Sequence, residues 1–171
     1  MSRVVTIWCA AAFVGGALFG ASQIAPPAQV AILSSGAAFA GAPLTERERF
    51  AVDVLAALGN TQPTVEAIAF VVAWTCAEDS GSGALARHNP LNTTQSGYNE
   101  THSINGDGVK GYATYDDGLA ATLQTLSYGY YDGVVMGLQT NDPALALQAL
   151  IASPWAGSHY NGGASWPHGG C

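Results

Sequence analysis

Basic residues are scarce in this chain. Its 171 residues include five Lys and Arg against 12 Asp and Glu, which gives a net charge of −7 at pH 7. Nucleic-acid binding depends on clusters of Lys and Arg that neutralise phosphates, so this composition excludes a nucleic-acid partner. There are four His, and no two of them have the close helical spacing that places zinc ligands on one face. We therefore expect neither a metal nor another cofactor.

Charge is also nearly absent from the first 45 residues, where Arg3 is the only charged side chain. Residues 4–21 are apolar or small, a pattern typical of a secretion signal or a short membrane anchor. A second apolar stretch at residues 28–42 follows Pro26-Pro27, which would break a continuous helix. The leader therefore has two parts.

The triplet Ala38-Phe39-Ala40 has the small-x-small form that signal peptidase recognises, with the cut before Gly41. We expect residues 1–41 to be either such a signal peptide or an uncleaved membrane anchor with a linker. The protein is then secreted or extracytoplasmic and contacts a membrane only through this segment. The rest of the chain is long enough for one monomeric domain, at residues 42–160, followed by a Gly-rich tail at residues 161–171.

The domain carries the signals of a mainly α-helical fold. Thr45-Glu46-Arg47-Glu48 is a capping box that predicts a helix start, and Gly59-Asn60 predicts the end of that helix. The next helix should open near Pro63 and run to about Ala77. Its nearly uniform apolarity predicts the central, buried helix of the domain.

Further along, residues 80–107 are rich in Gly, Asn, Ser and Thr and predict a loop. The β-prone segment at residues 109–115 predicts one arm of a small hairpin. We expect Asp116 to cap one helix, Asp132 to begin a shorter one, and Asn141-Asp142-Pro143 to begin another.

The carboxyl group of Glu78 is the strongest candidate for chemistry. It closes the apolar run at residues 69–77 and precedes the polar loop. A carboxyl group that leaves a buried helix end into a cleft is partly desolvated, which raises its pKa and lets it hold a proton near neutral pH. Cleavage of a glycosidic bond needs such an acid to protonate the leaving oxygen. The alternative is a solvated Glu at a helix end.

Two of the three cysteines, Cys76 and Cys171, lie outside the leader. They either form a disulfide, which export would permit and which would tie the tail to the Glu78 helix, or remain a buried thiol and a loose one. A thiol peptidase built on Cys76 is disfavoured, because a nucleophilic Cys favours a helix amino terminus and Cys76 is near a carboxyl end. Little after Trp155 can be buried, so we expect the end of the tail to be mobile.

The order of these features resembles the lysozyme-like superfamily, specifically bacterial and phage peptidoglycan hydrolases of the endo-β-N-acetylglucosaminidase branch. In that branch a catalytic Glu ends a helix, an Asn-containing motif follows, and an aromatic segment precedes the next helix. The features that correspond here are Glu78, Asn89-Pro90-Leu91-Asn92 and Tyr112-Ala113-Thr114-Tyr115, within about residues 64–160. The resemblance implies a lysozyme-like helical domain with a small β-hairpin, whose partner is the glycan strands of peptidoglycan.

By the same resemblance Glu78 is the catalytic acid. The residues implied to hold or shape the sugar site are Asn89, Leu91, Asn92, Thr93, Tyr112, Tyr115, Trp155 and Tyr160. An aromatic face buries the apolar side of a pyranose, which favours a stacking role for Tyr115 and for Trp155, placed at the cleft rim. We expect Trp74, inside an apolar helix, in the core instead.

Two departures from the branch leave the chemistry open. Asn92-Thr93-Thr94 replaces its Gly-Ile-Lys continuation, and Trp155-Ala156-Gly157-Ser158 replaces a late Tyr-Ala-Thr-Asp segment. A second carboxylate is unassigned among Asp79, Glu100, Asp107, Asp116 and Asp117. Glucosaminidase, muramidase and lytic transglycosylase activities all fit. The alternative from another class is a non-catalytic glycan-binding module or a structural module of a virion or cell surface.

Overall fold

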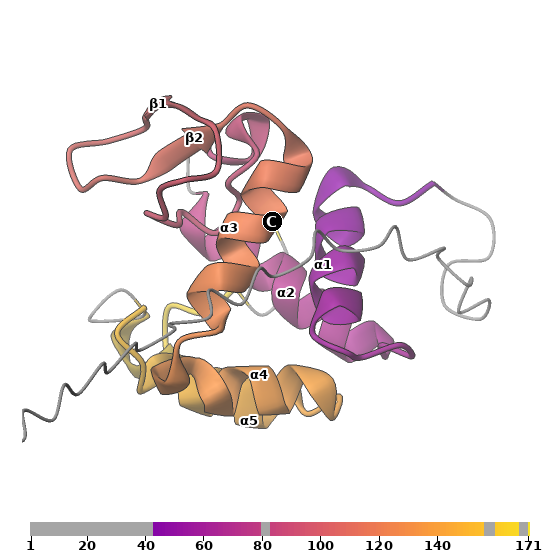
Figure 1. The fold of residues 1–171 in the computed structure, drawn as a ribbon. Helices are drawn as coiled ribbons and strands as arrows, with labels where there is room; N and C mark the ends of the chain where they lie inside the picture. Colours follow the sequence, from indigo (N-terminus) through magenta and orange to yellow (C-terminus); the bar gives the residue numbers. More distant parts are fainter. Residues whose placement is uncertain (1–42, 80–82, 156–159, 168–170) are drawn as a thin grey trace, which may run out of the picture.

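The computed structural model describes residues 43–79, 83–155, 160–167 and 171, so the predicted leader lies outside the described residues. The described residues form a mainly helical fold with a small antiparallel sheet of two strands (Figure 1), as predicted. Its elements are α1 (Glu46–Ala57), α2 (Val65–Glu78), η1 (Leu85–Arg87), β1 (Glu100–Ser103), β2 (Lys110–Tyr112), α3 (Tyr115–Leu126), η2 (Gly129–Tyr131), α4 (Asp132–Gln139), α5 (Pro143–Ile151) and η3 (Asn161–Gly163), where η marks a 3-10 helix. No helix in these ranges has both the length and the apolarity of a membrane span.

α1 begins with the predicted capping box. Thr45 Oγ1 accepts a hydrogen bond from the Glu48 N–H at 3.3 Å, and the Glu48 carboxylate accepts one from the Thr45 N–H at 2.8 Å. α5 likewise starts at Pro143 after the N-cap Asp142, whose carboxylate accepts from the Leu145 N–H. Local side-chain chemistry therefore fixes both helix starts, as the sequence predicts.

The start of α3 differs from the prediction, because its N-cap is Thr114 and not Asp116. Thr114 has the extended backbone that an N-cap requires, with φ −133° and ψ 160°, and its hydroxyl accepts from the Asp117 N–H. Asp116 already lies in the first helical turn, where a negative charge suits the helix dipole.

α2 is the central helix, as predicted. It packs against α1 along one side and contacts α5 (Figure 1), and its Val71 and Trp74 side chains are fully buried. The other large, fully buried apolar side chains come from α1, the loop after η1, α3, α4 and α5: Phe50, Val54, Leu55, Leu91, Leu126, Val134, Leu138 and Leu150. This core surrounds the helix that ends in Glu78.

α4 and α5 pack almost backbone to backbone, at the end of the molecule opposite the hairpin (Figure 1). A Cβ at Gly137 of α4 would lie 2.5 Å from the Ala146 nitrogen, and one at Gly133 would lie 2.9 Å from the Ala149 Cβ. Side chains larger than hydrogen at Gly137 would therefore push the helices apart, so the pair forms one tightly joined unit.

A second close approach joins α3 to the loop after η1. A Cβ at Gly118 of α3 would lie 1.6 Å from the His88 carbonyl oxygen. His88 itself has a left-handed backbone, with φ 56°, which turns the chain out of η1. The segment that follows, residues 89–93, is thereby set directly on α3.

The predicted hairpin arm is β2, which pairs antiparallel with β1. Glu100 stands opposite Tyr112 and Ser103 opposite Lys110. In the turn between the strands, the Asn105 side-chain oxygen accepts hydrogen bonds from the N–H groups of Asp107 and Val109, at 3.0 and 3.2 Å. The hairpin is a small projection beside the amino-terminal end of α3 (Figure 1).

The expectation that the tail has little to bury was wrong. Trp166 is only 7% exposed and stacks on Phe70 of α2, with ring centroids 5.0 Å apart. Tyr160 is also buried, and its ring meets that of Trp166 edge-on at 5.3 Å. The surrounding Gly residues predicted a loose segment, but two large aromatic rings supply enough apolar surface to hold it against α2.

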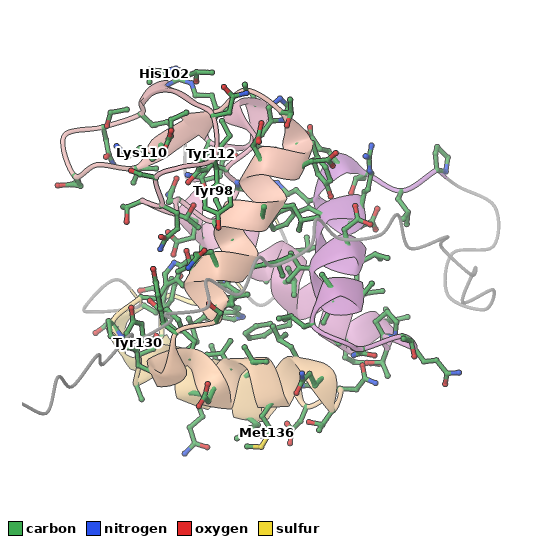
Figure 2. All side chains as sticks on the ribbon, in the orientation of Figure 1. Tyr98, His102, Lys110, Tyr112, Tyr130 and Met136 are labelled. Atoms are coloured by element: carbon green, nitrogen blue, oxygen red, sulfur yellow. A yellow bond between two sulfur atoms is a disulfide. The ribbon has the colours of Figure 1, made fainter. Side chains whose placement is uncertain are left out.

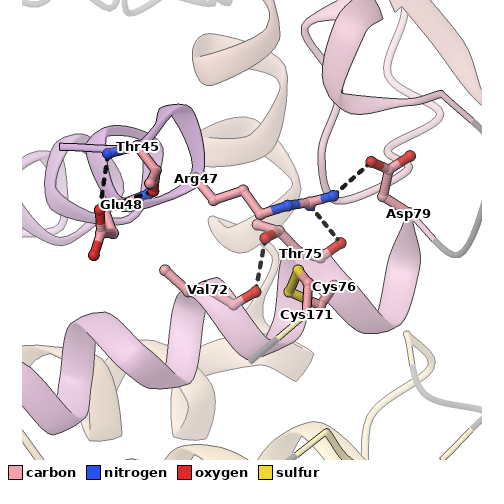
Figure 3. The surroundings of a disulfide bond; sticks show 8 residues. All are labelled: Thr45, Arg47, Glu48, Val72, Thr75, Cys76, Asp79 and Cys171. Atoms are coloured by element: carbon pink, nitrogen blue, oxygen red, sulfur yellow. Dashed lines mark hydrogen bonds and ion pairs between the residues drawn. A yellow bond between two sulfur atoms is a disulfide. The ribbon is translucent and has the colours of Figure 1, made fainter. Parts of the chain in front are cut away.

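Cys76 and Cys171 form a disulfide, so the first of the two alternatives holds. The bond spans a sequence separation of 95 and links the tail to the last turns of α2 (Figure 3). It therefore ties the tail to the helix that carries Glu78.

We expect the Cys76→Ala/Cys171→Ala variant to be less stable by about 2–5 kcal/mol, because a disulfide across a long loop restricts the unfolded chain. Unfolding in guanidinium chloride, with and without reductant, measures this. Reductant should lower the midpoint of the native protein to that of the variant and leave the variant unchanged. A native midpoint that reductant does not move would contradict the expectation.

Candidate active site

The site is built on the carboxyl end of α2, where Glu78 is the last helical residue and is half-buried. Helix ends leave carbonyl oxygens without intrahelical partners, and these must be satisfied from elsewhere. The Asn92 side-chain amide donates to the Glu78 carbonyl oxygen at 2.6 Å. The N–H of the C-cap residue, Asp79, donates to the Thr75 carbonyl oxygen at 3.0 Å.

Arg47 reaches from α1 to the same helix end (Figure 3). Its guanidinium donates to the Thr75 carbonyl oxygen at 3.0 Å and pairs with the Asp79 carboxylate at 2.8 Å. A cation at a helix carboxyl end also complements the helix dipole. The second Asp79 oxygen accepts from the Ala84 N–H at 2.7 Å. Asp79 is therefore committed to holding the helix end, which removes one of the candidates for a second catalytic carboxylate.

The Glu78 carboxyl group has a donor on each oxygen. The Tyr160 hydroxyl donates to one oxygen, and the Asn92 amide nitrogen lies 3.4 Å from the other. Asn92 has a left-handed backbone, with φ 54°, a conformation that Asn tolerates better than most residues. Asn92 and Tyr160, both predicted as site residues, thus meet at Glu78.

Aromatic rings surround this carboxyl group. Trp155 packs edge-on against Trp74 and Tyr131, with ring centroids 4.7 and 5.4 Å apart. Burial raises the pKa of Tyr131 to about 12, and the charges of Tyr130 and Glu78 act in the same direction. The carboxyl group of Glu78 therefore lies within electrostatic reach of a buried phenol that stays protonated at neutral pH.

Tyr160 stays protonated as well. Burial, the negative charge of Glu78 and the hydrogen bond to Glu78 raise the pKa of Tyr160, and the Trp74 side chain opposes this only in part. Tyr160 consequently acts as a hydrogen-bond donor to Glu78 throughout the physiological pH range. Trp74 is fully buried, as predicted, and Trp155 is half-buried.

The loop predicted to hold the sugar is largely buried. Asn89 and Leu91 are 0% exposed, and Thr93 is 3% exposed. The Asn89 amide donates to the carbonyl oxygens of Thr93 and Lys110, at 2.9 and 2.7 Å, and its oxygen accepts from the Thr93 N–H at 2.8 Å. Asn89 thus acts as a substitute backbone that closes the loop against β2, and its contacts are internal.

Tyr112 belongs to the same buried network. Its hydroxyl lies 3.0 Å from Thr93 Oγ1 and donates to the Gln95 carbonyl oxygen at 2.9 Å. Burial raises the pKa of Tyr112, so this hydroxyl remains a donor. Of the predicted motif Asn89-Pro90-Leu91-Asn92, only Asn92 contacts Glu78 among the contacts described here. The other members position it.

Tyr115 ties α3 to α1. Its hydroxyl donates to the Asp53 carboxylate at 2.6 Å, its ring packs edge-on against Phe50, and the Arg49 guanidinium lies 4.6 Å from its ring centroid. Burial and Asp53 raise the pKa of Tyr115. These contacts give Tyr115 a packing role, and none of them involves Glu78.

The remaining acidic candidates are placed away from α2. Asp117 accepts from the Thr114 hydroxyl at the start of α3, next to the exposed Asp116. Glu100 and Asp107 belong to the hairpin and its turn. Backbone hydrogen bonds lower the pKa of Glu100, so this group is a carboxylate and not an acid at neutral pH. The structure therefore assigns no partner carboxylate to Glu78.

Two other chemistries lose their support. Cys76 is in a disulfide and offers no thiolate for a peptidase. Within the part of the chain that the structure describes, no three His, Cys, Asp or Glu side chains gather as metal ligands would. His159 and His168 lie outside that part.

Sequence reasoning missed Tyr131. The signal was present in Tyr128-Gly129-Tyr130-Tyr131, a dense aromatic segment between two predicted helices. It also missed a groove of about 600 Å³ between α2, α5 and the tail. This groove is mostly apolar, and its lining, which includes Ala69, Leu147 and Trp166, does not include Glu78.

No protein-family model matches this chain, and no curated protein or solved structure matches it either. The argument for function therefore depends on the geometry around Glu78 and on the order of motifs in the sequence.

A double-mutant cycle tests the contact between Glu78 and Tyr160. Tyr160→Phe removes the donor and keeps the ring, while Glu78→Gln removes the charge and keeps the shape. We expect a coupling free energy of about 1 kcal/mol, since hydrogen bonds to charged groups are stronger than those to neutral ones. Urea unfolding of the four proteins gives this value, and strictly additive losses would mean that the contact does not form.

Asn89→Ala should destabilise the fold by about 1–3 kcal/mol for each buried backbone group it leaves without a partner. Thr94→Ala, at an exposed position in the same loop, is the matched control and should change the free energy of unfolding by less than about 0.5 kcal/mol. Thermal unfolding followed by circular dichroism compares them. If Asn89→Ala melts like the control, Asn89 is not the structural residue described here.

Proposed function

We propose that this protein cleaves the glycan strands of peptidoglycan, with Glu78 as the general acid of a lysozyme-like domain. The observation that carries the proposal is the half-buried carboxyl group at the end of α2, held by Tyr160 and Asn92 and bordered by aromatic rings. A carboxyl group in such surroundings suits proton donation to a glycosidic oxygen. The helical fold with one hairpin and the sequence order of acid, Asn motif and aromatic segment support the same assignment.

In the first step, protonated Glu78 donates its proton to the glycosidic oxygen as the bond from that oxygen to the anomeric carbon breaks. The bonding electrons stay with the leaving oxygen, and positive charge develops at the anomeric carbon. The Glu78 carboxylate is then negative, and the donors Tyr160 and Asn92 stabilise that charge. Trp155, half-buried beside Tyr131, offers a ring for the apolar face of a sugar.

A nucleophile completes the reaction at the anomeric carbon. Water gives hydrolysis, whereas the C6 hydroxyl of the same sugar gives an anhydro ring, and in either case the proton of the nucleophile returns to Glu78. Because Asp79 is paired with Arg47, the arrangement favours routes that need one carboxyl group. The lytic transglycosylase route is the simplest of these, because its nucleophile is part of the substrate.

The second candidate function is a non-catalytic glycan-binding or surface structural module. The observation that favours it is the same pairing of Asp79, because a two-carboxylate mechanism lacks its nearest second group. In both functions we place the protein outside the cytoplasm, because the disulfide fits an oxidising compartment and the leader fits export.

Glu78→Gln should abolish clearing of cell-wall suspensions while it preserves the melting temperature within a few degrees, because an amide matches the acid in shape but cannot donate the proton. Glu46→Gln, at an exposed position in the first turn of α1, is the control and should clear at the native rate. Mass spectrometry of the released fragments identifies the bond cut, and an anhydro product is lighter than the hydrolytic one by one water. Clearing by Glu78→Gln at the native rate would refute the role of Glu78, whereas native protein that binds walls without releasing fragments would favour the second candidate.

A further inference from the structure

Tyr98, Tyr128 and Tyr130, which we call the tyrosine row, link the hairpin side of the molecule to the candidate acid. Tyr128 and Tyr130 have ring centroids 5.7 Å apart, and Tyr130 and Tyr131 have centroids 4.6 Å apart. Burial and the neighbouring Tyr128 raise the pKa of Tyr98, which places those two phenols close together. Since Tyr131 packs on Trp155, the rings continue into the site around Glu78.

The tyrosine row is not explained by core packing. Tyr130 is 57% exposed, and Tyr98 and Tyr128 are half-buried, whereas Tyr131 is buried. Figure 2 shows Tyr98 beside the hairpin and Tyr130 where α3 gives way to α4. The row therefore covers the length of α3 on the outside of the molecule. Contiguous exposed aromatic surface of this kind marks binding surfaces.

Hydrogen bonds hold two of these rings in place. The Tyr98 hydroxyl donates to the Gln124 side-chain oxygen on α3 at 2.6 Å, and the Tyr128 hydroxyl donates to the Gln95 side-chain oxygen at 3.2 Å. Gln95 is itself tied to Tyr112 through its carbonyl oxygen. Rings that are fixed before binding lose little conformational entropy when a ligand arrives.

The chemistry of the row fits an uncharged sugar polymer. Tyrosine rings present an apolar face and a polar edge, as a pyranose does, and the polar groups beside them, Gln95 and Gln124, are neutral amides that can exchange hydrogen bonds with sugar hydroxyl and acetamido groups. The chain is acidic overall, which disfavours a polyanionic partner.

We propose that Tyr98, Tyr128 and Tyr130 form a set of subsites for an extended chain of N-acetylated amino sugars, and that this chain runs along α3 from the hairpin to the bond cleaved at Glu78. The inference rests on the proposed function and adds to it a preference for long glycan strands. Short fragments reach only the sugars next to Glu78, whereas long ones gain the contacts of the row.

The test uses the full chain with Glu78→Gln as the parent, so that ligands are not cut, and titrates chitobiose and chitohexaose by calorimetry. Adding Tyr130→Ala should weaken chitohexaose binding about 5–10-fold, the effect of losing one stacked ring, and leave chitobiose binding unchanged. Tyr130→Trp, which keeps a ring, should restore the affinity. Met136→Ala, at a position 50% exposed on α4 and outside the row, is the matched control and should change neither.

Tyr98→Ala tests the far end of the row and should weaken chitohexaose in the same way, with a thermal melt to confirm folding. Equal affinity of the parent and both Ala variants for chitohexaose would overturn the inference. So would a loss of equal size for both ligands, or a parent that binds no chitohexaose. Wall clearing by Glu78→Gln would refute the acid role separately, because the length dependence of binding is measured without any cleavage.

Discussion

The end of α2 is the constraint on which the rest of the site depends. An α-helix that stops inside a protein leaves carbonyl groups that water cannot reach freely, and each needs a donor. Here the donors come from distant parts of the chain: Arg47 from α1 and Asn92 from the loop, with the disulfide holding the tail beside them. Satisfying the helix end therefore also assembles the groups around Glu78. Stability and the geometry of the acid have the same origin in this fold.

Much of the fold was predictable because its signals are local. The capping box at Thr45, the Asp142-Pro143 start and the uniform apolarity of α2 each act within a few residues. The error at α3 was also local: Thr114 and Asp116 are both capping residue types, and only the backbone conformation decides between them. Propensity alone could not supply that conformation.

The candidate site was predictable only in part, because residue type does not reveal direction. The motif Asn89-Pro90-Leu91-Asn92 indicated polar contacts, yet Asn89 faces inward to close the loop while Asn92, three positions later, faces the acid. A left-handed residue and the close approach of Gly118 to His88 set that difference, and both are long-range consequences of packing. Trp166 was missed for a similar reason, since its partner Phe70 is far away in sequence.

The joining of α4 to α5 through Gly137 and Ala146 bears on how the site could move. Tyr131 comes directly before α4 and Trp155 comes shortly after α5, so both aromatic neighbours of the acid are attached to this helix pair. Glu78 belongs to a different body, the central helix. A rocking of the pair against α2 would therefore carry the two rings together, as one jaw, and would change the width of the opening above the acid without disturbing either helix.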